Sequence, residues 1–294
     1  MATTKEIKRK ISSVDNIQQI TRAMQLMSVA KMRKATDRAT NTRPYAKRAR
    51  EILETVTQAE KIQHPLLRYQ ESDKILAIVI ASDKGLCGNF NGALRKQLNQ
   101  LQASVSRDIS AVTVGKKATQ FTKRAGPDVV GSFSGFDEKT ELSDIGGLFS
   151  AVHEEFLSGD YYRVPVIYTH YQTAMERTPL VRQLFPVDVE NMGQTLTADD
   201  STDETPRSVL RNYLFEPSES AVAGAVLPRF SRVRLYQAVL ESQASEHSAR
   251  MFAMKNATEN AEEISEELET EYNRARQSEI TQEIADISSA ANAL

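Results

Sequence analysis

The sequence predicts an α/β fold in which a central open sheet lies between two long helices that pair as an antiparallel coiled coil. Eleven of the twelve glycines fall between Gly85 and Gly193, which indicates that short elements are confined to the middle of the chain. The two ends carry opposite charge, since residues 1–50 hold 13 Lys or Arg against 3 Asp or Glu, and residues 241–294 hold 4 against 12. The expected domains are an N-terminal helix, an α/β domain and a C-terminal helix, over 1–62, 63–207 and 208–294.

The first helix is predicted to run from about Thr4 to about Glu60, because the first 84 residues contain no glycine. Pro44 is expected to kink it, since proline lacks the backbone donor and clashes with the preceding turn. One face of this helix is apolar and is expected to pack against a partner helix. That face comprises Ile7, Ile11, Val14, Ile17, Ile20, Met24 and Met27.

The middle of the chain alternates between strand-like and helix-like segments, which is typical of an open, Rossmann-like α/β sheet with helical cover. The expected strands cover residues 75–81, 109–115, 163–171 and 179–187. The expected helices cover residues 91–103, 116–125 and 144–158. The polar stretch ADDSTDETP is expected to form a loop or linker over residues 198–206.

The last helix is predicted to begin near Ser208 or Ser220 and to continue almost to Leu294, because residues 229–294 contain neither glycine nor proline. At 1.5 Å per residue this stretch alone gives a rod of about 100 Å, which we expect other subunits to surround. A seam with the coiled-coil step of 3.5 residues runs along it. The seam consists of Val233, Tyr236, Leu240, Ala244, His247, Met251, Met254, Thr258, Ala261, Ile264, Leu268, Tyr272 and Ala275.

Composition narrows the classes of function. The single cysteine, Cys87, excludes an internal disulfide and fits a reducing compartment. No apolar run approaches the roughly 18 to 20 residues that a membrane span needs, and the first residues contain no apolar signal core. We therefore expect an intracellular protein whose role at a membrane, where it has one, is indirect.

The stretch SDKGLCGNFNG, residues 82–92, follows a predicted buried strand and resembles a phosphate-binding loop. A P-loop requires Gly-Lys followed by Ser or Thr at the start of a helix. Here Lys84 precedes Gly85, and in VGKKAT the position of the hydroxyl residue is taken by Lys117. The sequence therefore disfavours a nucleotide site, and we expect no cofactor.

Cys87 could alternatively serve as a nucleophile, which would require a base beside it. The sequence places none of the four histidines there, so a structural thiol is favoured. His247 falls on the predicted helical seam and completes no known metal-ligand spacing, which favours a packed side chain over a metal ligand.

Four ordered stretches resemble the gamma subunits of F-type rotary ATP synthases, and they extend over essentially the whole chain. They are ITRAMQLMSVAKMRKA (20–35), SDKGLCGNFN (82–91), ESQASEHSARMFAMKNATENA (241–261) and YNRARQSEITQEI (272–284). The resemblance is to the bacterial type, since the cysteine-containing regulatory insert of chloroplast relatives has no counterpart.

This resemblance implies a central-stalk rotor subunit with no catalytic site of its own. The chain would couple ion-driven rotation of the membrane ring to conformational change, and so to ATP synthesis or hydrolysis, at the alpha/beta sites. Its implied partners are the alpha and beta subunits around the shaft, an epsilon-type subunit and the membrane c-ring, with one copy per complex. Its implied location is peripheral, at the cytoplasmic face of the cell membrane.

The resemblance also implies contacts with the beta subunits. Arg276 and Gln277 would form a catch, in which the planar guanidinium suits a carboxylate. Lys84 and Cys87 would lie near a second contact. Relatives commonly have Arg at the position of Lys84, and a lysine keeps the charge but loses the bidentate fork.

Further contacts are implied for the first helix and for a foot on the membrane ring. Residues of the first helix would face an acidic segment of the beta subunits or pack tightly against it; they are Arg22, Met24, Lys31, Arg33 and Lys34. The foot would include RNYLFEP (211–217), with Tyr213 and Glu216 as its candidate residues.

Two other classes of function stay open at the level of the residues. A nucleotide-using α/β enzyme would need a phosphate fingerprint, which the sequence lacks. A coiled-coil protein could use its basic first helix on nucleic acid, and its binding would then depend strongly on salt. That function would leave the acidic last helix without a use except to neutralise the first.

Overall fold

The protein is described here by a computed structural model, which covers residues 3–59, 64–188, 216 and 218–292. The chain forms two compact units. We call residues 1–29 and 250–294 the coil unit and residues 30–249 the sheet unit. Each unit receives a segment of both long helices, α1 (Thr4–Ala59) and α5 (Glu219–Asn292).

The sheet unit is built on five strands in the order β3-β2-β1-β4-β5. They are β1 (Lys74–Ile80), β2 (Asp108–Val114), β3 (Asp128–Phe133), β4 (Val164–Tyr171) and β5 (Arg177–Phe185). β1 pairs in parallel with β2 and β4, β2 pairs in parallel with β3, and only β5 runs antiparallel to its neighbour. The predicted open α/β sheet is therefore confirmed, with a topological switch point between β1 and β4.

Four of the five strands lie within two residues of their predicted bounds, whereas β3 was not predicted. β3 is an edge strand of six residues whose side chains are alternately exposed and half-buried. Its sequence, DVVGSF, contains Gly131, which interrupts the apolar pattern. A short edge strand of this kind gives a weak periodic signal.

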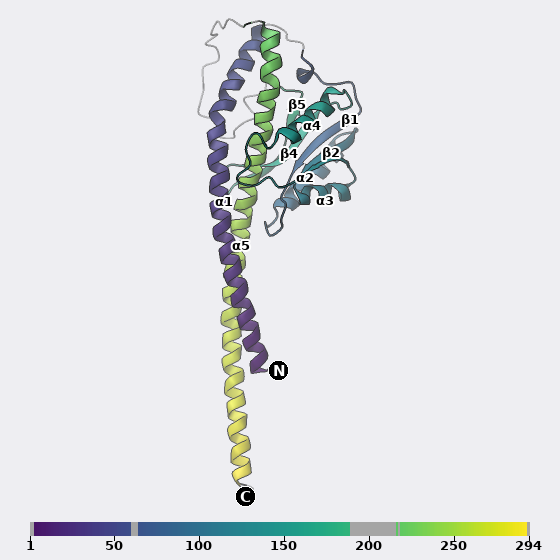
Figure 1. Ribbon diagram of the computed structural model, residues 1–294. Helices are drawn as coiled ribbons and strands as arrows, with labels where there is room; N and C mark the ends of the chain where they lie inside the picture. The colour runs from purple at the N-terminus through teal and green to yellow at the C-terminus, as the bar shows by residue number, and fades with distance from the viewer. Residues whose placement is uncertain (1–2, 60–63, 189–215, 217, 293–294) are drawn as a thin grey trace. The chain divides into compact units, whose positions relative to one another are not determined.

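Helices cover both faces of the sheet, as Figure 1 shows. Successive strand residues point to opposite faces, so Leu76 and Ile78 join a core with α4 (Gly146–Leu157) and the two long helices. Ala77 and Val79 join the core on the other face with α2 (Phe90–Ser104) and α3 (Lys116–Ala125). The sheet unit is thus a three-layer α/β structure.

The two long helices agree closely with their predicted bounds. α1 continues through Pro44, so the proline does not end it. The start of α5 supports the alternative near Ser220, because the hydroxyl of Ser218 accepts a hydrogen bond from the backbone N–H of Ala221 at 3.2 Å. The alternative start at Ser208 and the predicted linker at 198–206 lie outside the described residues.

In the coil unit α1 and α5 run antiparallel, as predicted. The Thr21 and Thr258 hydroxyls lie 2.7 Å apart. Moving toward the N-terminus of α1, Asp15 accepts from the hydroxyl of Ser265 at 3.0 Å. Farther along, the hydroxyl of Thr4 donates to the carboxylate of Glu279 at 2.8 Å. Residue numbers therefore fall along α1 as they rise along α5.

The predicted apolar seam of α1 is wrong at three positions beyond Val14, whereas Met24 is half-buried. Ile17, Ile20 and Met27 are 50%, 59% and 56% exposed, whereas Thr21 and Ser28 are buried. A step of three residues falls about 60° short of a helical turn, so two such steps after Val14 lead away from the partner helix. The buried face of α1 follows a mean step of 3.5 residues, and it therefore passes through the polar side chains of Thr21 and Ser28.

The predicted seam of α5 needs a similar correction at Ile264. This side chain is exposed, whereas Met254 and Ala261 on the same helix are buried. Ser265 takes the place of Ile264 in the seam, since its hydroxyl bonds to Asp15 of α1. The coil unit therefore buries polar and small side chains beside Ile7 and Met254. Several of its large apolar groups are exposed instead: Ile17, Ile20, Met27 and Ile264.

Candidate functional site

The loop after β1, residues 82–89, is fixed by its own polar side chains. The carboxylate of Asp83 accepts from the backbone N–H of Lys116 at 2.9 Å and from that of Gly135 at 3.0 Å, which ties together the loops after β1, β2 and β3. The amide of Asn91 donates to the hydroxyl of Ser82 at 2.7 Å. The polar residues of SDKGLCGNFN thus build a rigid loop at the carboxyl edge of the sheet.

This loop presents one charged and one apolar side chain to solvent. Lys84 is exposed, and Leu86 is 64% exposed. Leu86 has a φ of 61°, a left-handed conformation that residues with a side chain rarely adopt, apart from Asn and Asp. The sequence pointed to Lys84 but not to Leu86, whose only signal is an apolar residue between the glycines of a loop.

Cys87 belongs to the core and not to the loop surface. Its side chain is 2% exposed and packs with α2 and α3. The amide nitrogen of Asn91 lies 3.2 Å from its Sγ. This burial agrees with the predicted structural thiol, and it leaves Lys84 and Leu86 as the side chains that a neighbouring molecule could touch.

Helix α5 covers the carboxyl ends of β1 and β4, where open α/β sheets commonly bind their ligands. The Ser242 hydroxyl donates to the backbone oxygen of Ile80, the last residue of β1, at 3.5 Å. The Ser245 hydroxyl donates to the backbone oxygen of Thr169 in β4 at 3.2 Å. The carboxyl ends of β1 and β4 at the switch point are therefore covered by the chain's own helix.

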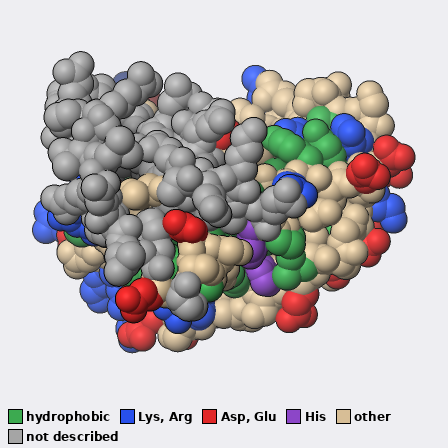
Figure 2. Space-filling view, turned by 90° about the horizontal axis from the view of Figure 1, so that it is seen from above, with side chains coloured by type: hydrophobic (Ala, Val, Ile, Leu, Met, Phe, Trp, Pro, Cys, Tyr) green, Lys and Arg blue, Asp and Glu red, His purple; other side chains and the backbone are tan. Residues whose placement is uncertain are grey.

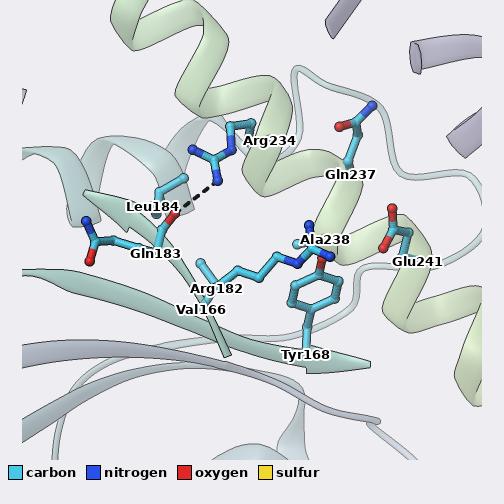
Figure 3. Close-up of a pocket in the computed structure, with 9 residues that line it drawn as sticks. All are labelled: Val166, Tyr168, Arg182, Gln183, Leu184, Arg234, Gln237, Ala238 and Glu241. Carbon is cyan, nitrogen blue, oxygen red and sulfur yellow. Dashed lines mark hydrogen bonds between the residues drawn. The ribbon is translucent and has the colours of Figure 1, made fainter. Parts of the chain in front are cut away.

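A polar cluster attaches α5 to β4 and β5 (Figure 3). Arg234 donates to the backbone oxygen of Gln183 at 3.0 Å, and Glu241 lies 2.6 Å from Nδ1 of His170. Burial lowers the pKa of Arg234 to about 10, and burial together with the Glu241 charge raises the pKa of Tyr168. The cavity between these groups measures about 30 Å³, which admits water but not a nucleotide.

A larger hollow of about 450 Å³ lies at the amino ends of β1 and β2. Its charged lining residues carry both signs: Lys74, Arg107, Asp108 and Asp128. Ligand sites of open α/β sheets lie at the opposite, carboxyl ends of the strands. Among the described residues, no group of three or more His, Cys, Asp or Glu is arranged to hold a metal ion.

The basic residues expected to contact beta subunits differ in their surroundings. Arg22, Arg33 and Lys34 are exposed on α1, and Met24 is half-buried. Lys31 instead donates to the carboxylate of Glu138 at 3.0 Å. Three of the four basic side chains thus face solvent, and the fourth is engaged within the sheet unit.

The remaining predicted contacts lie on α5 and before it. Arg276 and Gln277 are exposed. Farther along the helix Ile280, Ile284 and Ile287 are exposed as well, which the sequence analysis did not single out. Of the two candidate foot residues, Glu216 is exposed and Tyr213 lies outside the described residues.

Within the described residues, no helix is both long and apolar enough to cross a membrane. The long helices carry charged side chains throughout, and their exposed apolar residues are scattered among them.

Comparisons with known proteins agree with these features. A family model described as ATP synthase matches residues 3–294. The ATP synthase gamma chain of Pelotomaculum thermopropionicum is 36% identical over 296 residues, and that of Cupriavidus pinatubonensis is 37% identical over 298, with all of this chain and of each relative covered.

Solved structures share the fold. The central stalk and c-ring structure of Tetrahymena thermophila mitochondrial ATP synthase contains a chain that matches with a TM-score of 0.60 at 24% identity, over 81% of this chain and 99% of that one. A chain of Euglena gracilis mitochondrial ATP synthase matches with a TM-score of 0.66 at 19% identity, over 99% and 94%. Since the family model and the relatives extend over essentially the whole sequence, the chain belongs to the ATP synthase gamma-chain family.

Proposed function

We propose that this chain transmits rotation within an F-type ATP synthase and performs no catalysis itself. As a member of the gamma-chain family it is the rotor subunit of that complex. The chain would couple turning of the membrane c-ring to opening and closing of catalytic sites on surrounding alpha and beta subunits, with an epsilon-type subunit bound beside it. It would work at the cytoplasmic face of the cell membrane as a peripheral subunit.

The observation that carries this proposal is the inverted pattern of the coil unit. Ile17, Ile20 and Met27 are exposed on α1, while Thr21 and Ser28 are buried. Exposed apolar groups lose contact with water when a neighbour covers them. A surrounding sleeve of alpha and beta subunits would supply such a cover, and apolar contacts can exchange as the shaft turns because they are non-directional.

Directional contacts would then set where the rotor stops. A rotor shifts the equilibrium of a catalytic site only through contacts that differ between its open and closed forms. Arg276 and Gln277, which are exposed on α5, would form such a catch, with the guanidinium on a beta-subunit carboxylate. Lys84 and Leu86 would form the second contact, carried on the rigid loop after β1, with Cys87 as its buried support.

Other predicted contacts complete the proposed surface. The basic residues of α1 would face an acidic segment of the beta subunits, with Met24 in the tightest packing; they are Arg22, Arg33, Lys34 and Lys31. For Lys31, such a contact would compete with its ion pair to Glu138. Tyr213 and Glu216 are proposed as foot residues on the c-ring.

The proposed lack of catalysis is supported by the filled switch point. The two serines of α5, Ser242 and Ser245, occupy the strand ends where a nucleotide would otherwise bind. The loop after β1 uses Asp83 to bind neighbouring loops, not a metal or a phosphate.

Co-purification tests the proposal. Expressed with the alpha and beta subunits of an F-type ATP synthase, the chain is expected to elute with them as one copy per alpha–beta ring. Alpha and beta subunits that are well folded but elute without this chain would contradict the proposed role. In the assembled complex, Arg276→Ala with Gln277→Ala is expected to lower ATP turnover, and unchanged turnover would remove both residues from the catch.

A further inference from the structure

The loop between β3 and α4, residues 134–145, contacts both long helices inside the sheet unit. From α1, the ammonium of Lys31 donates to the carboxylate of Glu138 at 3.0 Å. Two turns further along the sheet-unit segment of α1, Nη1 of Arg38 donates to the backbone oxygen of Thr140 at 2.7 Å. Two points of one helix, two turns apart, are thus attached to this loop.

The same loop accepts hydrogen bonds from α5. The Tyr236 hydroxyl donates to the backbone oxygen of Thr140 at 2.9 Å, so this one oxygen accepts from both helices. One turn before Tyr236, Nη2 of Arg232 donates to the backbone oxygens of Leu142 and Ser143 at 2.8 and 3.2 Å. The loop therefore bridges α1 and α5 through directional bonds.

The loop is internally fixed, which a bridge under load requires. The hydroxyl of Thr140 accepts from the backbone N–H of Asp137 at 2.8 Å, and the carboxylate of Asp137 accepts from that of Lys139 at 2.8 Å. The carboxylate of Asp144 accepts from the N–H of Glu141 at 2.7 Å. Thr140 is buried, so its bonds are shielded from exchange with water.

The pKa shifts of Glu138 and Tyr236 agree with these hydrogen bonds between the loop and the helices. Burial alone would raise the pKa of Glu138, but the hydrogen bond from Lys31, with the charges of Lys31 and His247, holds it below its usual value. The pKa of Tyr236 is raised, chiefly by burial, so its hydroxyl keeps the proton that it donates to Thr140.

We propose that the loop at 134–145 is a clasp that makes both long helices turn together with the α/β sheet, and that Arg38 and Arg232 are its positioning residues. The close-packed apolar core also joins these helices to the sheet, but the hydrophobic effect that drives its burial is non-directional. Guanidinium bonds to fixed carbonyl oxygens set the axial and rotational register. This inference rests on the proposed rotor function and names the part of the chain through which load would pass.

The test uses the complete ATP synthase in membrane vesicles, with the double variant Arg38→Gln and Arg232→Gln. ATP hydrolysis and the membrane potential generated by it are measured in the same preparation. Hydrolysis is expected to stay within about twofold, because the coil unit is unchanged, while the potential generated per ATP hydrolysed falls to about half or less. If Arg38 and Arg232 only stabilised the fold, the hydrolysis rate and the membrane potential would fall together, in proportion to the loss of assembled complex.

Two variants serve as controls. Arg48→Gln removes an exposed arginine of α1 whose partner, Glu51, lies one turn away on the same helix, and it is expected to change neither quantity. Arg38→Lys with Arg232→Lys keeps a cationic donor at each position and is expected to recover most of the coupling. Failure of the lysine variant to improve on the glutamine variant would contradict the positioning role.

Hydrogen exchange provides a second readout that does not depend on ion transport. The backbone amides of Asp137, Lys139 and Glu141 are expected to exchange at least about tenfold faster in the glutamine variant, including in preparations where it assembles poorly. An unchanged exchange rate, or an unchanged potential per ATP in a complete complex, would overturn the clasp. Absence of the wild-type chain from the complex would instead contradict the proposed rotor function.

Discussion

The two long helices bury different kinds of side chain in the two units of the molecule. In the sheet unit, α1 and α5 bury Leu53, Leu227, Phe230 and Leu235 against the sheet and its helices. In the coil unit, hydroxyls and small groups form much of the contact between the helices, while Ile17, Ile20 and Met27 are exposed. One part of each helix is therefore stabilised by its own chain, and the proposed function assigns the other part to contacts with partners.

The difference lies in what each helix segment must do. A segment that carries load with its own domain benefits from a fixed apolar core, whose packing admits little movement. A segment that turns within a sleeve needs an apolar outer surface and tolerates a weak inner seam. Replacing apolar residues in each unit, and measuring both folding stability and assembly, distinguishes the two roles.

The largest effect is expected in the sheet unit. Leu235→Ala should lower the free energy of unfolding by about 2–5 kcal/mol, because it leaves a cavity at a fully buried position. Ile20→Ala in the coil unit should change it by less than about 0.5 kcal/mol, since the side chain is largely exposed. Urea unfolding of the full chain measures both, and equal losses would contradict the comparison.

The second prediction concerns assembly with partner subunits, for which the exposed residues of the coil unit are expected to matter more than they do for folding stability. Ile20→Asp with Met27→Asp should reduce co-purification with alpha and beta subunits several-fold, because it places charge on the surface that the sleeve covers. Gln19→Asp adds a charge at an exposed polar position of α1 and should assemble normally. Equal recovery of all three chains would show that this surface is not covered.

A smaller effect is expected at the seam of the coil unit. Thr21→Val with Thr258→Val removes both hydroxyls of a facing pair and leaves neither without its partner. Such a paired replacement is expected to be neutral or to stabilise the chain by up to about 1 kcal/mol. A loss of more than that amount in urea unfolding would mean that the hydroxyl pair, and not the sleeve, holds the helices together.

The smallest effect concerns two half-buried histidines of the sheet unit, His64 and His153. Figure 2 shows histidine side chains at the surface in the view from above, beside hydrophobic ones. Burial lowers the pKa of both, and His153 lowers that of His64 further. His64 also accepts, through Nδ1, the backbone N–H of Leu66 at 3.2 Å, a bond that protonation would break.

The sign of the resulting pH dependence follows from the lowered pKa. The unfolded chain binds protons first as pH falls, so stability is complete above about pH 6.5 and declines below it. His64→Asn keeps an acceptor for the Leu66 amide and cannot titrate, so its unfolding midpoint should vary less between pH 7 and 5. An identical pH profile for the variant and the wild-type chain would exclude His64 as a source of the decline.

The fold was largely predictable because its signals are local. Glycine placement bounded the helices, and apolar runs marked four strands to within two residues. β3 was not predicted, because a short edge strand whose side chains are alternately exposed and half-buried contains no continuous apolar run. The seam of the coil unit is not predictable from hydrophobicity alone. Hydrophobicity places Ile17 and Ile20 on the buried face of α1, whereas the helical period places Thr21 there.

The candidate sites were predictable only in part, because they depend on contacts between distant residues. Lys84 was found through its motif, and Leu86 was missed because its exposure follows from the left-handed turn. No local pattern shows that Ser242 and Ser245 fill the switch point, or that Thr140 accepts bonds from two helices. These features need the packed structure, in which segments about 100 residues apart meet.

The central claim, that this chain turns past its beta-subunit neighbours, is tested most directly by a reversible cross-link. Lys84→Cys, at the exposed tip of the loop after β1, is paired with a cysteine in a facing beta-subunit loop of the assembled complex. Oxidation is expected to stop ATP turnover and reduction to restore it, while the same treatment of the chain with only the buried Cys87 leaves turnover unchanged. Turnover that continues at its full rate with the cross-link complete would contradict rotation of this subunit.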